Sequence, residues 1–343
     1  MSNLKNFNPK NERIKNKYFK FLLTAKQKHI KSVDQARKSL IKYEEFSHFA
    51  DFTAFKPEVA IAFKEYLLMQ TSKQRGQPFS QHTLNSILKN VRDFFEWLAF
   101  ENNYKKYIKL TDTAYLKPSL KEMAMTRKAS FVNFASITEL EKVVFSLPSE
   151  TDIQKRDRAL IAFVLLTGVR DGTLKGFKLK HINLEKELLH QDPKEVETKF
   201  SKEIYTFFFP VDFRIKQIFI DYYNFLIKEK GFTSNDPLFP KLESVVSNEG
   251  LPLPPVITKE HYRSITSIRE VFKQAFINAG VPYHSPHTFR HSLVAYGEEI
   301  CKTPEEFKAW SQNLGHEHVS TTFTSYGKLE VYKQGIVMKR IKS

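Results

Sequence analysis

The residues best suited to chemistry gather in two short segments near the C-terminal end of the chain. One begins Ser-Pro-His-Thr-Phe-Arg at Ser285 and is expected to open a helix, with the serine as N-cap and the proline as first helical residue. That start places His287 and Arg290 three residues apart on one helical face. The free backbone N–H groups of a helix start favour anions, and a guanidinium with an imidazole completes a site suited to one phosphate group.

The second segment adds another histidine and a tyrosine. Gly315 is expected to end a helix, His316 follows at once, and Tyr326 lies ten positions further on. An arginine, two histidines and a tyrosine together suit the transfer of a phosphodiester to the tyrosine. A phenol with a pKa near 10 is a weak nucleophile at neutral pH, so a cation-rich pocket would be needed to favour its ionised form.

The composition fits a nucleic-acid-binding protein without requiring one. The chain has 343 residues, enough for two domains, and a formal net charge of +16. A lysine-rich compositional bias, which 31 Phe and only 11 Gly also indicate, is the alternative explanation. The single cysteine, Cys301, excludes an internal disulfide. No apolar run reaches the length of a membrane span and no signal peptide is recognisable, so we expect a cytoplasmic protein without a membrane partner.

Two lobes are expected to position these residues. Residues 1–15 are polar and basic and are expected to be flexible, whereas 16–104 have the periodicity of a helical domain. Ser80 caps a helix with a long apolar stripe, and Lys89 and Arg92 lie off that stripe. These two cations are candidate DNA contacts, although the solvated basic face of an ordinary helical bundle would have the same pattern.

A basic segment separates the two lobes. Between 105 and 135 the apolar periodicity breaks down and positive charge accumulates, which is typical of an interdomain linker. The charge could face a duplex that passes between the lobes, or it could simply be solvated. The candidate DNA contacts in this segment are Lys105, Lys106, Lys121, Arg127 and Lys128.

The second lobe, 136–328, is expected to be helical around a small antiparallel β-sheet, so the fold class is mainly α with an α+β second domain. A strongly apolar helix over 153–167 ends at Gly168, just before Arg170. Two short strands, 188–191 and 203–211, flank a loop that carries three lysines.

Further elements are expected along the rest of this lobe. Helices are predicted over 136–147 and 213–230, and Thr303 with Glu306 is predicted to start another. The segment 232–262 contains five prolines and is interpreted as a surface loop. A capping box formed by Ser267 and Glu270 is predicted to open a helix that ends at Gly280.

Five motifs, taken in order, resemble those of the tyrosine recombinases, also called the phage-integrase family. They are Thr-Gly-Val-Arg ending at Arg170, a lysine near Lys199 in the hairpin loop, His-Thr-Phe-Arg from His287 to Arg290, Leu-Gly-His ending at His316, and Thr-Thr-Phe-Thr-Ser-Tyr ending at Tyr326. The resemblance covers about 136–330 and extends loosely into the first lobe. It implies a helical core-binding (SAM-like) DNA-binding domain followed by an integrase-type catalytic domain.

The resemblance also implies catalytic roles. Tyr326 would attack the scissile phosphate and leave a 3′-phosphotyrosine and a free 5′-hydroxyl. Arg170 and Arg290 would hold the nonbridging oxygens, a task that suits planar, forked donors. His287 and His316 would add hydrogen bonds, and His287 could assist proton movement.

The leaving oxygen needs a proton, and a lysine of the hairpin loop would supply it. Lys199 is the first candidate because it lies just ahead of the second strand, with Lys202 and Lys194 as alternatives. The adduct retains the energy of the phosphodiester, so the resemblance implies no metal, no nucleotide and no other cofactor.

The partners implied by the resemblance are duplex DNA, clamped by the two lobes, and further copies of the chain. Four protomers would exchange strands through a Holliday junction, with a monomer as the alternative when free. The basic tail 329–343 would dock on a neighbouring protomer, or it is a frayed terminus.

The chain departs from the family pattern at one position, and other functions stay open. The family carries an acid three residues after the first arginine, where this chain has Thr173, and Asp171 is a candidate replacement. A non-catalytic DNA-binding protein and a type IB topoisomerase are alternatives. A metal-dependent nuclease is another, with ligands drawn from four histidines, but no Glu of a His-Glu-x-x-His motif and no acidic cluster accompany them. These histidines are His287, His291, His316 and His318.

Overall fold

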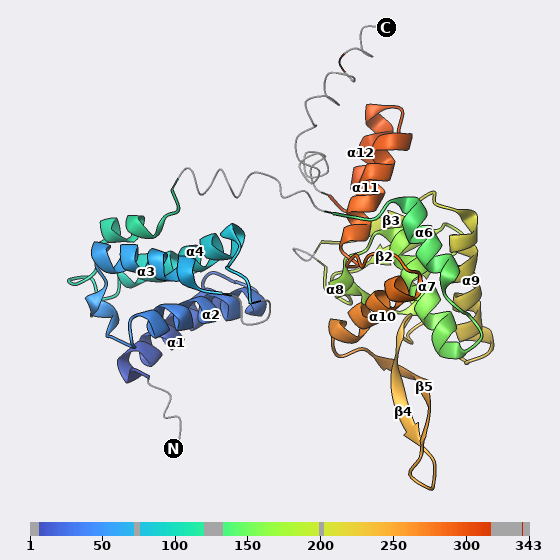
Figure 1. Cartoon of the computed structure of the whole chain (residues 1–343), viewed down its shortest axis with the longest axis horizontal. Helices are drawn as coiled ribbons and strands as arrows, with labels where there is room; N and C mark the ends of the chain where they lie inside the picture. Colours follow the sequence, from blue (N-terminus) through green and yellow to red (C-terminus); the bar gives the residue numbers. More distant parts are fainter. Residues whose placement is uncertain (1–6, 72–75, 120–132, 199–201, 317–337, 339–343) are drawn as a thin grey trace. The chain divides into compact units, whose positions relative to one another are not determined.

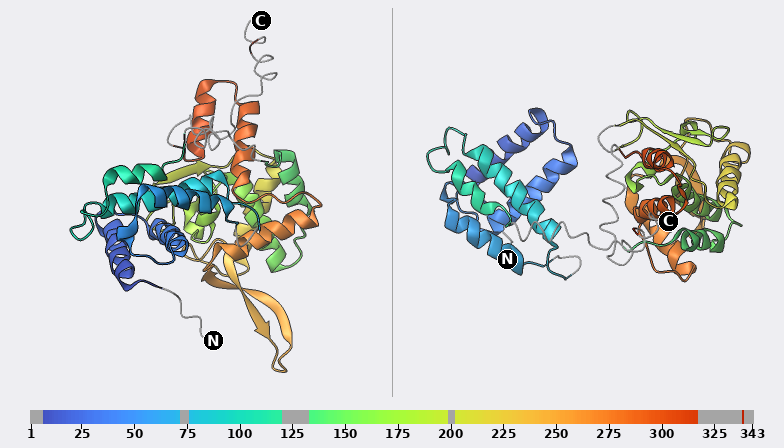
Figure 2. Two further views of the ribbon diagram at one scale, coloured as in Figure 1. Left: turned by 60° about the vertical axis from the view of Figure 1, so that its left-hand side comes forward. Right: turned by 90° about the horizontal axis from the view of Figure 1, so that it is seen from above.

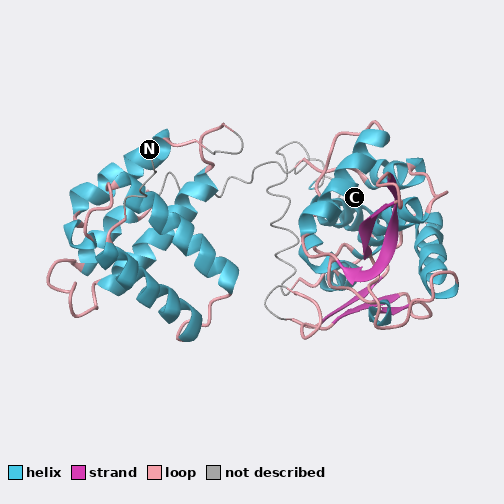
Figure 3. Cartoon of the chain, turned by 90° about the horizontal axis from the view of Figure 1, so that it is seen from below, coloured by secondary structure: helices cyan, strands magenta, loops and turns pink. Residues whose placement is uncertain are grey.

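The structure is a computed structural model, and it describes residues 7–71, 76–119, 133–198, 202–316 and 338. The chain divides into two compact units, Met1–Lys128 and Ala129–Ser343, and each has a hydrophobic core of its own. Helices dominate, and the second unit also contains two small antiparallel sheets (Figure 1, Figure 3). The predicted fold class, mainly α with a small antiparallel sheet, is confirmed.

The first unit is a helical bundle with an aromatic core. Its helices are α1 (Pro9–Thr24), α2 (Ile30–Phe46), η1 (Phe52–Ala54), α3 (Pro57–Met69), α4 (Gln81–Leu98) and η2 (Leu110–Leu116). Ser80 caps α4 as expected, by accepting a hydrogen bond from the Thr83 backbone N–H. Phe55 and Phe95 stack with ring centroids 3.9 Å apart inside this core.

Part of the basic segment expected to link the lobes packs with the first unit. Ile108 and Leu116 are buried in the same core as the helices, and η2 contacts α3 and α4. The apolar side chains that achieve this are widely spaced along the segment, so helical periodicity did not reveal them.

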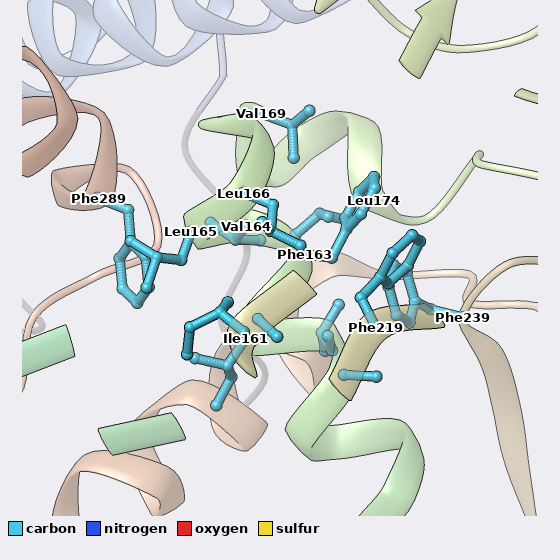
Figure 4. Packing of buried hydrophobic residues seen from close by; sticks show 14 of the residues in the cluster. Ile161, Phe163, Val164, Leu165, Leu166, Val169, Leu174, Phe219, Phe239 and Phe289 are labelled. Atoms are coloured by element: carbon cyan, nitrogen blue, oxygen red, sulfur yellow. The ribbon is translucent and has the colours of Figure 1, made fainter. Parts of the chain in front are cut away.

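The second unit is built around α7 (Asp152–Thr167), whose last two turns are buried on all sides. Figure 4 shows Phe163 beside Phe219 and Phe239, and Leu165 beside Phe289. The surrounding helices are α6 (Ile137–Ser146), α8 (Asp171–Leu174), η3 (Leu179–His181), α9 (Phe213–Lys228), α10 (Ile265–Asn278), α11 (Thr288–Ile300) and α12 (Pro304–Asn313). The helix start predicted at Thr303 and Glu306 is confirmed, and these two side chains form a capping box at the start of α12.

A three-stranded sheet has the order β1-β2-β3, formed by Ile182–Asn183, Leu188–Gln191 and Ile204–Phe207. The pairing is antiparallel, with Leu189 opposite Thr206, and the predicted hairpin is confirmed. The second strand ends at Phe207 rather than at 211, because the Phe209 N–H donates to the Leu166 carbonyl and the chain turns onto α7.

The prediction of a surface loop over 232–262 is wrong for most of that segment. Strands β4 (Pro240–Val246) and β5 (Pro252–His261) form a long antiparallel hairpin there (Figure 1). Strand prolines are tolerated where no ladder N–H is needed, as in a two-stranded ribbon with open edges. The prolines therefore gave this segment the composition of a loop, although they are compatible with a β-hairpin.

Two predicted helix starts are also wrong in detail. The N-cap of α10 is Ser264, not Ser267. The helix α11 starts at Thr288 with His287 at its N-cap position, and Ser285 does not cap it. The Ser285 carbonyl instead accepts hydrogen bonds from the backbone N–H and the hydroxyl of Thr288, in a tighter turn that precedes the helix. In the described part of the chain, every helix is too short or too polar to cross a lipid bilayer.

Candidate active site

Three chain segments meet around the guanidinium of Arg290, which is 7 % exposed. Its Nη1 donates to the carbonyl of Gly168, at the end of α7, and its Nη2 donates to the carbonyl of Leu314, at the end of α12. The same Nη2 lies 3.1 Å from Nε2 of His316. Two of the predicted catalytic residues are thus in contact although 26 positions separate them.

Gly168 is required for this meeting on two grounds. It ends α7 in the left-handed conformation with φ of 55°, where its N–H donates to the Val164 carbonyl. A Cβ there would approach Leu293 to 2.8 Å and Leu314 to 2.9 Å. The glycine therefore lets the end of α7 lie against α11 and the end of α12, with its carbonyl toward Arg290.

His316 is positioned by the backbone at the end of α12. Gly315 has φ of 70°, its N–H donates to the Gln312 carbonyl, and the His316 N–H donates to the Ser311 carbonyl. These two bonds form a Schellman motif, which fixes the direction in which the chain leaves the helix. The predicted helix stop at Gly315 is confirmed, and it directs the imidazole toward Arg290.

Arg170 follows Gly168 by two residues and meets a different environment. It is half-buried at the N-cap of α8, and burial lowers the pKa of its guanidinium below the ordinary value. Among the described residues its side chain has no hydrogen-bond or ion-pair partner. A cation held partly out of water without a counter-charge is suited to receive an anion.

The carbonyl of Arg170 is held by Thr173, the residue that replaces the expected acid. The Thr173 hydroxyl donates to that carbonyl over 2.6 Å, and the Thr173 N–H donates to it over 3.0 Å. Asp171, considered as the replacement, instead forms an ion pair with Arg269 of α10. Thr173 thus supports the backbone of Arg170, not its guanidinium.

His287 is exposed at the start of α11, and its ring is perpendicular to that of His291 with centroids 5.6 Å apart. Burial, together with the nearby His287 and Arg290, lowers the pKa of His291. This environment favours the neutral form of His291. Within the described ranges, no three His, Cys, Asp or Glu side chains are arranged to hold a metal ion; His318 lies outside those ranges.

Lys199 and Tyr326 lie outside the described residues, but the start of the lysine loop is described. Glu195 accepts hydrogen bonds from Lys180 over 2.7 Å, from His181 over 3.1 Å and from Lys178 over 3.4 Å. These bonds, above all that of Lys180, lower the pKa of Glu195 to about 2. Because the next residue, Val196, is buried, the chain enters the loop from a fixed point.

The strand that follows the loop is tied to α12 by Asn313. Its side-chain Oδ1 accepts from the Phe207 N–H over 2.7 Å, and its Nδ2 donates to the Phe207 carbonyl over 2.8 Å. The amide imitates a neighbouring strand at the edge of β3. Asn313 and Glu195 were not predicted from the sequence. A polar residue at a helix end or in a loop can form many different contacts, so its type and position do not indicate which one it forms.

The candidate DNA contacts fall into three groups. Lys89 on α4 forms an ion pair with Asp93. Arg92 on the same helix forms ion pairs with Asp93 and Glu96. Lys105 and Lys106 follow α4 and are exposed. The three others, Lys121, Arg127 and Lys128, lie outside the described residues.

Sequence comparisons identify curated relatives, although the chain matches no family model. It is 24 % identical over 252 residues to the tyrosine recombinase XerC of Lactobacillus leichmannii, and this alignment covers 72 % of this chain and 72 % of the relative. It is also 24 % identical over 296 residues to the XerC of Halalkalibacterium halodurans, covering 83 % of this chain and 84 % of the relative.

Structure comparisons show the same fold in solved recombinases and integrases. A λ integrase dimer bound to a core site has a TM-score of 0.59 at 15 % identity, and covers 93 % of this chain and 99 % of its own. XerH bound to a palindromic difH substrate has a TM-score of 0.60 at 17 % identity, with coverages of 95 % and 82 %. The fold is thus one shared by DNA recombinases. Together with the curated relatives, it confirms the resemblance of the chain to the tyrosine recombinases.

Proposed function

We propose that this chain is a site-specific DNA recombinase of the integrase type. It cuts and rejoins duplex DNA through a 3′-phosphotyrosine intermediate, and exchanges strands through a Holliday junction. The observation that carries the proposal is the cluster around Arg290. One buried guanidinium fixed by two carbonyls touches His316, and the half-buried Arg170 lies two residues from one of those carbonyls.

The two arginines act on the scissile phosphate. Arg290 is preorganised because two backbone carbonyls restrain it, so little reorganisation is needed when charge develops on the nonbridging oxygens. Arg170 gains the counter-charge that it lacks among the described residues. Stabilisation of charge on the equatorial oxygens supplies most of the catalysis in phosphoryl transfer.

The proposed bond changes are those of phosphodiester transfer to a tyrosine. The phenol oxygen of Tyr326 passes its proton to solvent water and bonds to phosphorus, while the bond from phosphorus to the 5′ oxygen breaks. Lys199 gives that oxygen a proton, with Lys202 as the alternative donor. His316 and His287 donate hydrogen bonds to the phosphate, and the reverse sequence, with a new 5′-hydroxyl as nucleophile, rejoins the strand.

The partners in this proposal are duplex DNA and other copies of the chain. Two solved neighbours of the same fold are protein–DNA complexes, one of them a dimer on a core site. Strand exchange between two duplexes requires four nucleophiles, so the active assembly is a tetramer on DNA.

A covalent-trapping experiment tests the proposal. The substrate is a duplex enriched from random sequence by binding to the chain and then nicked near the scissile phosphate, so that a short fragment leaves after cleavage. We expect a denaturant-resistant protein–DNA adduct with the wild type, in the presence of a chelator, and none with Tyr326→Phe, which retains binding.

The other outcomes separate the competing functions. Binding without an adduct would indicate a non-catalytic DNA-binding protein. Chelator-sensitive cleavage without an adduct would indicate a metal-dependent nuclease. Relaxation of supercoiled DNA without site preference would indicate a type IB topoisomerase.

A further inference from the structure

The β4–β5 hairpin projects from the second unit on a firmly held base (Figure 1, Figure 2). Arg156 is only 2 % exposed, donates to the Pro240 carbonyl over 3.3 Å, and lies 5.6 Å from the centre of the Tyr262 ring. The Thr258 hydroxyl donates to the Lys241 carbonyl over 2.9 Å. The hairpin therefore leaves the unit in a direction fixed by its base.

The distal half of the hairpin, residues 243–256, exposes apolar side chains. The exposed fractions are 65 % for Val246, 60 % for Leu251, 45 % for Leu253 and 48 % for Val256. In the strand register, Val256 pairs with Glu243, Leu253 with Val245, and the Ser247 N–H donates to the Leu251 carbonyl. Because opposed residues share a face and neighbours along a strand alternate, Leu251, Leu253 and Val256 form one patch, and Val246 lies on the other face. Apolar side chains gathered on a projecting element, away from the core, are typical of a surface that binds another macromolecule.

The charge of the distal half distinguishes between the possible partners. Glu243 and Glu249 are its only charged residues, in a chain whose net charge is +16. Acidic side chains beside an apolar patch repel the phosphates of a nucleic acid and attract a basic protein surface. The most readily available basic protein surface is that of another copy of the chain.

The prolines limit the way in which a partner can bind. Pro252, Pro254 and Pro255 on β5 have no N–H to donate, so this strand is a poor template for an added strand. The contact is therefore made by side chains. We propose that the distal half of the β4–β5 hairpin docks on the basic surface of a second copy of this chain, with Leu251, Leu253 and Val256 at the centre of the contact.

Photo-crosslinking of the full-length chain tests this proposal. A benzophenone amino acid replaces Leu251, and the purified protein is irradiated with and without duplex DNA. We expect a covalent dimer of the chain, whose yield falls at least tenfold when Glu243→Lys and Glu249→Lys are added. The matched control carries the same crosslinker at Phe213, which is 74 % exposed at the start of α9, and should give no dimer.

Other crosslinking results would contradict the docking proposal. Crosslinks confined to the same chain or to DNA would overturn the docking proposal, as would a dimer whose yield ignores the charge reversal or is matched by the Phe213 control. Equal melting temperatures of the variants establish that a lost crosslink is not a lost fold. None of these outcomes bears on the covalent DNA adduct, so the proposed function is tested separately.

Discussion

At the scale of single residues, the two arginines of the site have opposite relations to the fold. Arg290 is buried and satisfies two backbone carbonyls that end α7 and α12. Arg170 is half-buried, and no described residue accepts a hydrogen bond from its side chain. In the proposed DNA complex, Arg290 keeps these contacts, whereas Arg170 gains the phosphate as a partner.

Substitution of each arginine by alanine should separate these roles. Arg290→Ala leaves two buried carbonyls without a donor, so we expect about 1–3 kcal/mol of lost stability. Arg170→Ala should change stability by no more than about 0.5 kcal/mol. Each should slow adduct formation by about 10²–10³, the usual effect of removing one preorganised donor. Thermal unfolding and single-turnover cleavage measure the two effects, and equal destabilisation by both variants would contradict this distinction.

Glu195 gives the lysine loop a pH-dependent anchor. Its pKa is lowered to about 2 in the folded chain from an ordinary value near 4.5, so between these values the unfolded state binds more protons. The stabilisation is therefore complete above about pH 4.5 and is lost as the pH falls toward 2. The stability difference between the wild type and Glu195→Gln should shrink over this range in denaturant titrations. Glu185→Gln is the control, because Glu185 is exposed and has no partner in the described residues. A comparable pH-dependent stability difference for this variant would contradict the role of Glu195.

At the scale of elements, two glycines that end helices offer a matched comparison. Gly315 and Gly280 both have a positive φ, of 70° and 63°, so alanine is strained at either by about 1 kcal/mol. A Cβ at Gly315 would lie 3.0 Å from Ile204 of β3, whereas a Cβ at Gly280 would have nothing within 4 Å. We expect Gly315→Ala to lose more stability in thermal unfolding, and also cleavage activity because His316 is displaced. Gly280→Ala should cleave normally, and equal activities of the two variants would disprove this role of the α12 end.

The sequence predicted those elements whose signals are local. The start of α12 at Thr303 and the glycine stops of α7 and α12 are local signals, and all three were predicted. The β4–β5 hairpin was missed because its prolines resemble those of a loop. Its two strands pair with each other, and both lie in one segment without a regular apolar pattern.

The sequence could predict the residue types of the candidate site but not the contacts between them, for a physical reason. The residue types of Arg290 and His316 are visible in the sequence, but their contact depends on how α11 and α12 pack. The acceptors that hold Arg290 are backbone carbonyls of Gly168 and Leu314, which any residue possesses. Side-chain patterns therefore indicate the reactive groups and not the atoms that orient them.

At the scale of the whole molecule, the net charge of +16 predicts a strongly salt-dependent affinity for duplex DNA. The logarithm of the affinity should fall with the logarithm of salt concentration, with a slope of about −0.9 for each phosphate neutralised. Removing both Lys105 and Lys106, which are exposed, should make this slope shallower by about two. Lys259→Ala is the control, because Lys259 pairs with Asp236 at the base of the hairpin. Fluorescence anisotropy from 50 to 200 mM salt measures the slope, and a flat response would exclude the proposed electrostatic contacts.

The central claim is that Arg170, Arg290 and His316 hold a phosphodiester for attack by the phenol of Tyr326. The most direct measurement is the mass-spectrometric location of the nucleotide that stays attached to the chain after a nicked duplex is cleaved and the adduct is digested. The account predicts a 3′-linked nucleotide on the peptide that contains Tyr326, and adduct formation slowed by about 10²–10³ with Arg170→Ala under the same single-turnover conditions. A nucleotide attached to any other residue, or cleavage that leaves no attached nucleotide, would contradict it.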